Sequence, residues 1–143
     1  MINIPSSIIR VRYSDVDRMG LLYHVNYFEY FEVARSDWIR HFWKPYKEIE
    51  DSGLALVVIE AHLNYLKSGR YDDEIEIRTG ITEYGRSRLK FEYDMHLRGQ
   101  DARLCTGWTT HCFVNSLWKP VAIPTELRER LNQYLGTLNQ TKA

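Results

Sequence analysis

Two carboxylates, a glycine, a histidine and an asparagine fall close together near the start of this chain. Asp15 and Asp17 are two residues apart, Gly20 follows them, and His24 and Asn26 open a pattern typical of a helix. A carboxylate can attack a carbonyl or activate a water molecule, and the free N–H groups at a helix N-terminus can hold the oxyanion that forms. The segment therefore predicts acyl-transfer chemistry, with Asp17 as a candidate reacting carboxylate and the helix start at His24 as a candidate oxyanion site.

Each of these residues also has a structural interpretation. Aspartates often cap turns and helices, so Asp15 and Asp17 could do no more than hold the loop and the helix that follows. His24 could simply be the first residue of the helix, and Asn26 could be a cap or form an interface hydrogen bond. Residue types and spacing leave both interpretations open.

Metal binding is a third interpretation of the same segment, and the sequence argues against it. Asp15, Asp17 and Gly20 match the first, third and sixth positions of a calcium loop, but Met19 and Asn26 stand where an oxygen ligand and a bidentate glutamate are required. The five histidines form no HxxxH or HxH pair. We therefore expect no metal site.

Two further groups of residues have competing interpretations. Aromatic side chains repeat at helical spacing along residues 27–43, and a hydrophobic core explains them better than a substrate pocket does. Arg86, Arg88 and Lys90 share one face of a predicted strand, where they would suit the phosphates of a nucleotide carrier. A solvated strand face is the alternative.

Composition narrows the class of protein. The 143 residues suit a single domain spanning residues 1–143, and 19 basic residues balance 19 acidic ones. This balance argues against a nucleic-acid partner, which requires a cationic surplus. Two cysteines without a CxxC spacing fit a reducing cytoplasm. No signal peptide is visible, and no apolar run approaches the roughly 20 residues of a membrane span.

Hydrophobic periodicity predicts an α+β fold. A strand over residues 8–13 precedes a long helix over 24–43 and a short one over 46–52. Strands follow over 54–66, 73–84, 88–98 and 102–115, and Pro124 opens a helix over 125–135 that Gly136 ends. Apolar and charged residues alternate along 88–98, so one face of the sheet is expected to be covered by the long helix. We expect a curved antiparallel sheet wrapped around that central helix.

The loop and helix start also resemble a known family. The motif runs Tyr13-x-Asp15-x-Asp17-x-x-Gly20-x-x-Tyr23-His24-x-x-Tyr27, followed by Glu32-x-Ala34-Arg35. Together with Arg70-Tyr71-Asp72-Asp73 and the segment 119–124, it is similar to the 4-hydroxybenzoyl-CoA thioesterase family of hot-dog proteins. Within that family it most resembles the acyl-CoA thioesterases of the Tol–Pal-associated branch.

The resemblance implies a hot-dog fold and hydrolysis of acyl-CoA thioesters, with coenzyme A as part of the substrate and no cofactor. The family's catalytic carboxylate falls on Asp17, and its oxyanion donor falls at or beside His24. Tyr23, Asn26 and Tyr27 become candidates for substrate contact, and Arg86, Arg88 and Lys90 for contact with coenzyme A. The resemblance also implies a homodimer or homotetramer with sites at subunit interfaces.

One departure from the family pattern bears on substrate range. The family often has threonine at position 16 and small residues at 18 and 19, whereas this chain has Val16, Arg18 and Met19. Two rival functions remain open. One is a hot-dog enoyl-CoA hydratase or dehydratase that uses Asp17 and His24 as an acid–base pair, and the other is a non-catalytic acyl-CoA binding module.

Overall fold

The computed structural model describes residues 4–142, which form one antiparallel sheet with three α-helices. In chain order the elements are β1 (Ser7–Arg10), the 3₁₀ turn η1 (Tyr13–Asp15), α1 (Asn26–Phe42), α2 (Tyr46–Asp51), β2 (Ala55–Tyr65), β3 (Glu74–Tyr84), β4 (Arg88–Leu97), β5 (Arg103–Val114) and α3 (Thr125–Lys142). The five strands lie in the order β1-β3-β4-β5-β2, and all neighbours are antiparallel. The α+β hot-dog prediction is confirmed.

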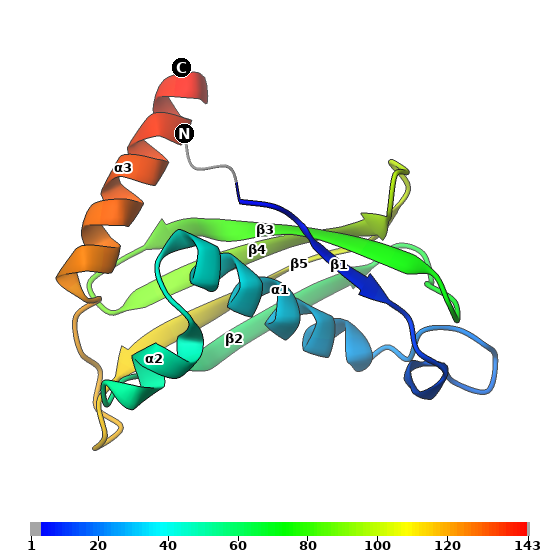
Figure 1. The fold of residues 1–143 in the computed structure, drawn as a ribbon, viewed down its shortest axis with the longest axis horizontal. Helices are drawn as coiled ribbons and strands as arrows, with labels where there is room; N and C mark the ends of the chain where they lie inside the picture. The colour runs from blue at the N-terminus through cyan, green and yellow to red at the C-terminus, as the bar shows by residue number, and fades with distance from the viewer. Residues whose placement is uncertain (1–3, 143) are drawn as a thin grey trace.

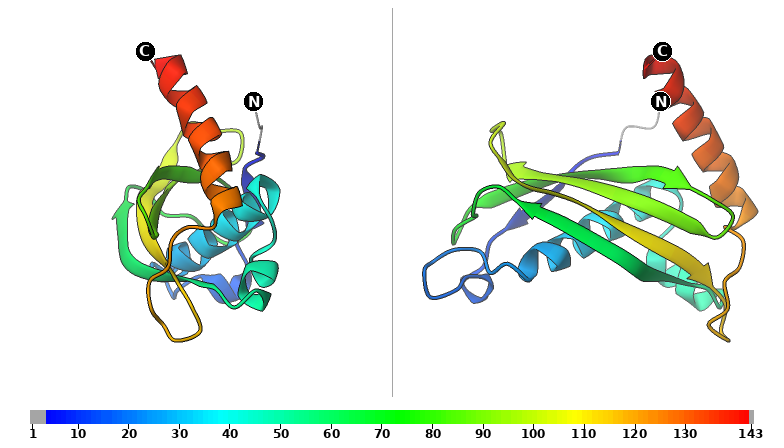
Figure 2. Two further views of the ribbon diagram at one scale, coloured as in Figure 1. Left: turned by 90° about the vertical axis from the view of Figure 1, so that its left-hand side faces the viewer. Right: turned by 180° about the vertical axis from the view of Figure 1, so that it is seen from behind.

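The sheet curves around α1, which lies along its concave face (Figures 1 and 2). Phe31 of α1 stacks on Tyr93 of β4 with ring centroids 4.1 Å apart, and Trp38 meets Phe91 edge-on at 5.7 Å. These side chains are almost completely buried, so the aromatic repeat of the helix is mainly core, as its spacing predicts. The packing holds the N-terminus of α1 at one end of the sheet.

Most elements begin and end within two residues of the predicted positions, but two expectations are wrong. Gly136 does not end α3, which continues to Lys142; a glycine inside a helix costs only about 1 kcal/mol and does not break it. The alternation of β4 predicts His96 on the exposed, charged face, yet this residue is buried, and its Nε2 lies 3.2 Å from Glu76 Oε1 on β3. A carboxylate on the neighbouring strand thus allows a polar side chain to be buried.

Cys105 and Cys112 are free, buried thiols on opposite faces of β5, as their odd spacing predicts. None of the helices described between residues 4 and 142 has the length and apolar character needed for a membrane span.

Candidate functional site

The loop between η1 and α1 holds Asp17 in a tight turn. The Asp17 N–H donates to the Leu21 carbonyl at 2.8 Å, and the Gly20 N–H donates to the Asp17 carbonyl at 3.0 Å. Gly20 has φ +77°, a left-handed conformation that glycine adopts without steric cost. Asp17 Oδ1 accepts from the N–H groups of Met19 at 2.8 Å and Leu21 at 3.2 Å. The turn-capping interpretation is confirmed for Oδ1, while Oδ2 makes no hydrogen bond to the described residues.

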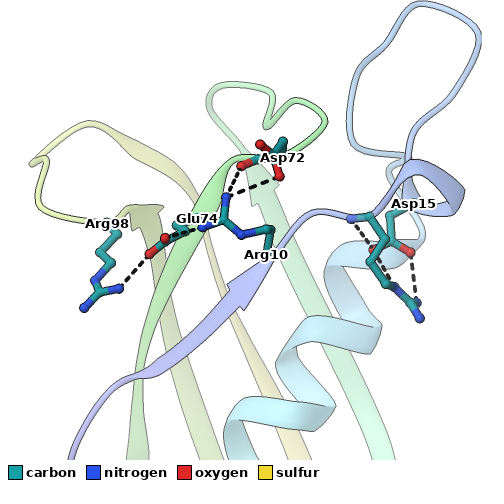
Figure 3. Close-up of polar contacts among 6 residues, drawn as sticks. Arg10, Asp15, Asp72, Glu74 and Arg98 are labelled. Atoms are coloured by element: carbon teal, nitrogen blue, oxygen red, sulfur yellow. Dashed lines mark hydrogen bonds and ion pairs between the residues drawn. The ribbon is translucent and has the colours of Figure 1, made fainter.

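Asp15 anchors the same loop to the body of the protein. Its carboxylate is buried and forms an ion pair with Arg12 at 3.0 Å (Figure 3). It also accepts from the Tyr30 hydroxyl of α1 at 2.8 Å. Burial raises the pKa of Asp15, but the hydrogen bonds from Arg12 and Tyr30 outweigh it and the net pKa is lowered. Asp15 is therefore a structural carboxylate, which joins β1, the loop and α1.

The start of α1 offers unpaired backbone donors. The helix begins at Asn26 with Val25 as its N-cap, and no side chain caps it. The Asn26 N–H donates to the Tyr23 carbonyl at 2.9 Å, whereas no backbone carbonyl within residues 4–142 accepts from the N–H groups of His24 or Val25. The Tyr65 hydroxyl donates to the His24 carbonyl at 2.7 Å and so holds this turn against the end of β2. An anion or developing oxyanion placed here would meet the positive end of the helix.

Asp17 and the start of α1 meet in one open cavity of about 330 Å³. It is lined by Asp17, Met19, Leu21, Leu22, His24, Tyr27, Tyr65, Leu66, Lys67 and Ser68. Burial raises the pKa of Tyr27 and Tyr65, so both phenols stay protonated near neutral pH. Across residues 4–142, no three His, Cys, Asp or Glu side chains gather in a way that could hold a metal ion.

Two of the substrate-contact candidates do not line this cavity. The Asn26 side chain donates to the Asp15 carbonyl at 3.0 Å, which is the structural role left open by the sequence. Tyr23 is 44% exposed and packs against the His24 ring, with centroids 4.6 Å apart. Tyr27 does line the cavity, and its hydroxyl accepts from the Gly69 N–H at 3.4 Å.

The sequence analysis did not identify the residues at the end of β2 that line the Asp17 cavity. Tyr65, Lys67 and Ser68 come directly after or at the end of a predicted strand, where functional side chains often lie, and that position was the available signal. Lys67 supplies the cavity with a cation that no motif around Asp17 indicated.

Arg86, Arg88 and Lys90 lie far from the Asp17 cavity within one chain. Arg88 and Lys90 line a separate open cavity of about 290 Å³ near the start of β4, and Lys90 lies over the Trp108 ring at 5.0 Å. Along β5, the partner of Arg88 is seven residues from the partner of Tyr65, which corresponds to roughly 20 Å. A single chain therefore does not bring these cations to Asp17.

Comparison with known proteins gives one consistent result. The family model described as the thioesterase-like superfamily matches residues 11–131. A protein named putative esterase from Aquifex aeolicus is 35% identical over 122 residues, covering 85% of this chain and 93% of its own. The acyl-CoA thioesterase YbgC of Haemophilus influenzae is 28% identical over 121 residues, covering 84% and 88%. The solved structure of a DHNA-CoA thioesterase from Staphylococcus aureus superposes with a TM-score of 0.90 at 27% identity, covering 97% of this chain and 95% of that one.

Proposed function

The chain belongs to the thioesterase-like superfamily, and on that premise we propose that it hydrolyses acyl-CoA thioesters to a free acid and coenzyme A. The observation that carries the proposal is the cavity in which Asp17 meets the unpaired N–H groups at the start of α1. Relatives named acyl-CoA thioesterases support the substrate class. The narrower assignment to the Tol–Pal-associated branch and the cytoplasmic location stay predictions.

In the proposed reaction, Asp17 acts through Oδ2, the oxygen that the turn leaves free, either as a nucleophile or as a general base. One route forms a bond between Oδ2 and the thioester carbonyl carbon, breaks the C–S bond to expel the thiolate of coenzyme A, and leaves a mixed anhydride that water hydrolyses. In the other route Oδ2 removes a proton from water as the water oxygen attacks the same carbon; the C–S bond then breaks, and the departing thiolate takes up the proton. In both, negative charge develops on the carbonyl oxygen, where the N–H groups of His24 and Val25 stabilise it. The two routes remain open.

Lys67 lines the same cavity as Asp17 and is proposed to contact the substrate near the thioester. Arg88 and Lys90 lie roughly 20 Å along the sheet from the end of β2 that borders this cavity. The pantetheine arm separates the thioester from the phosphates of coenzyme A by a comparable length, so these cations are proposed to contact the phosphates, from the same chain or from a second subunit.

We propose a homo-oligomer that forms through β2. This strand is 11 residues long, lies at the edge of the sheet and pairs only with β5 among the described elements. Val58 and Ile59 on β2 are 49% and 39% exposed, and Phe28 and Val33 of α1 add exposed apolar surface. An uncovered edge strand flanked by apolar side chains is suited to pair with the same strand of a second copy. A homodimer or a homotetramer would satisfy this geometry.

The proposed activity is tested by free-thiol release from a panel of acyl-CoA thioesters with short, long and aromatic acyl groups. We expect saturable thiol release from at least one member. If an enoyl-CoA loses its enoyl absorbance while no thiol appears, the chain is a hydratase. If acyl-CoA binds without either change, it is a binding module, and both results would contradict the proposal.

A further inference from the structure

A second cavity, of about 230 Å³, lies beneath the middle of α1 and shares no lining residue with the Asp17 cavity. Its walls come from α1, the start of α2, β2, β4 and β5, and it is lined by Glu32, Arg35, Ser36, Ile39, Tyr46, Leu56, Phe91 and His111. Three apolar side chains thus face one cation (Arg35), one carboxylate (Glu32) and several hydrogen-bonding groups. Arg35 is nine residues beyond the start of α1, which corresponds to roughly 13 Å along the helix.

A buried chain of hydrogen bonds ends at the wall of this cavity. The hydroxyls of Tyr93 and Thr109 are 2.6 Å apart, and Thr109 Oγ1 lies 2.7 Å from His111 Nε2. Either hydroxyl can donate in the contact between Tyr93 and Thr109, and the tautomer of His111 sets the direction of the contact with Nε2. In the tautomer in which Thr109 donates to Nε2, the single proton of a neutral His111 lies on Nδ1. Burial, and then the charge of Arg35, lower the pKa of His111 to about 4, so the ring is neutral near neutral pH.

The Nδ1 atom of His111 is buried and has no hydrogen-bond partner among the described residues, and the whole residue is only 1% exposed. A buried donor without a partner is unfavourable, so an acceptor in the cavity would be favoured.

Arg35 adds a positive charge to the same cavity. Within α1, the described structure has an ion pair between Asp37 and Arg40. Glu32 and Arg35 are also three residues apart and both line the cavity, but they do not form such an ion pair in the described structure. A guanidinium presents a planar set of donors that matches a carboxylate. The apolar walls formed by Ile39 and Phe91 suit a hydrocarbon body.

We propose that this cavity binds the carboxylate of a small organic acid with an apolar body, held by Arg35 and by the Nδ1–H group of His111. The acid has two possible sources. It is either the product that thioester hydrolysis releases, or a free acid unconnected with the reaction.

Calorimetric titration of the full chain with benzoate and hexanoate, in the absence of any thioester, tests the site without relying on catalysis. Benzamide and hexanamide are the neutral counterparts of these acids. We expect one acid to bind per chain, with the amides binding about tenfold more weakly or worse. Arg35→Gln should reduce the affinity for the acids by a similar factor, while Arg40→Gln on the exposed side of α1 serves as the matched control.

Ser36→Leu provides a second variant, because it narrows the cavity without touching the hydrogen-bonded chain. It should weaken binding of acids and amides alike, and far-UV circular dichroism checks that each variant is folded. Equal affinity for acid and amide, unchanged binding by Arg35→Gln, or no saturable binding at all would overturn the proposal. If the bound acid inhibits thioester turnover and Arg35→Gln abolishes this inhibition, the acid that the cavity binds is the reaction product. If the acid binds without inhibiting turnover, it is a free acid unconnected with the reaction.

Discussion

Asp15 accepts hydrogen bonds from Arg12 and Tyr30, whereas Asp17 accepts two from backbone N–H groups of its own turn. Both of those bonds to Asp17 involve Oδ1. The first carboxylate is thus fully engaged in holding the loop, and the second keeps one oxygen free at the edge of a cavity. This difference in partners, more than the Asp-x-Asp spacing, explains why only Asp17 is proposed to react.

Asp15→Asn should destabilise the protein by about 2 kcal/mol, because it removes a charged acceptor from the Tyr30 hydroxyl and from Arg12. Urea unfolding monitored by tryptophan fluorescence measures the change. Tyr30→Phe removes one hydrogen bond only and should cost about 1 kcal/mol. A fully stable Asp15→Asn variant would show that the loop is anchored by other contacts.

His111 should make stability depend on pH. Its pKa is about 4 in the folded protein and 6.5 when unperturbed, so the unfolded chain binds more protons between these values. Stability is therefore complete above about pH 6.5 and is lost progressively as the pH falls towards 4. From pH 7 to pH 5 the loss attributable to His111 should be about 2 kcal/mol.

Urea unfolding of His111→Gln at these two pH values tests this expectation. The variant should lose correspondingly less stability on acidification, while His41→Gln, at an exposed position on α1, should behave like the wild type. Equal pH dependence in all three proteins would contradict the assignment.

The site was predictable in part from single residues. Asp17 and His24 stand out because their types and spacing fit one chemistry, and the structure places both in one cavity. For Lys67 the only signal in the sequence was its position after a predicted strand, because no motif links this lysine to Asp17 and only the folding of β2 brings the two together. Asn26 was a candidate for substrate contact, but in this structure its side chain donates to the Asp15 carbonyl and does not line the cavity.

The close packing of α1 on the sheet depends on one position of β5. A Cβ atom built on Gly107 would lie 2.6 Å from Phe31 Cε2 and 2.6 Å from the His62 carbonyl oxygen. Glycine is therefore required there for steric reasons, because neither a core aromatic ring nor a paired backbone can move easily.

Gly107→Ala should destabilise the protein by about 3 kcal/mol, since α1 must shift away from the sheet or the strand must distort. Thermal unfolding followed by circular dichroism measures the loss. Gly136→Ala is the matched control, because a Cβ atom added there would have no atom within 4 Å and alanine favours a helix. A neutral Gly107→Ala variant would refute this explanation of the packing.

Helices and strands were largely predictable because each keeps one hydrophobic period along its length. The alternation in β4 and the aromatic repeat in α1 indicated which faces would meet. The end of α3 and the burial of His96 were not predictable, because the first depends on a glycine that a helix tolerates and the second on Glu76 of another strand.

In the molecule as a whole, β2 is a long strand at the edge of the sheet, with exposed apolar side chains beside it. If two copies pair through this edge, Val58→Lys should place a charge in an apolar interface and weaken association at least about tenfold. Light scattering coupled to size-exclusion chromatography, over a range of concentrations, measures the effect. Leu117→Lys, at an apolar position that is 71% exposed in the loop after β5, is the control. A monomeric wild type would contradict the proposed assembly.

The central claim is that Asp17 performs the chemistry, and the most direct test compares Asp17→Asn with Asp51→Asn, a change at an exposed position on α2. The measurement is kcat for free-thiol release from the best acyl-CoA substrate, with substrate affinity and thermal stability recorded for each variant. We predict that Asp17→Asn lowers kcat by at least about a thousandfold, with little change in affinity or folding, while Asp51→Asn matches the wild type. Undiminished turnover by a folded Asp17→Asn variant would contradict the claim.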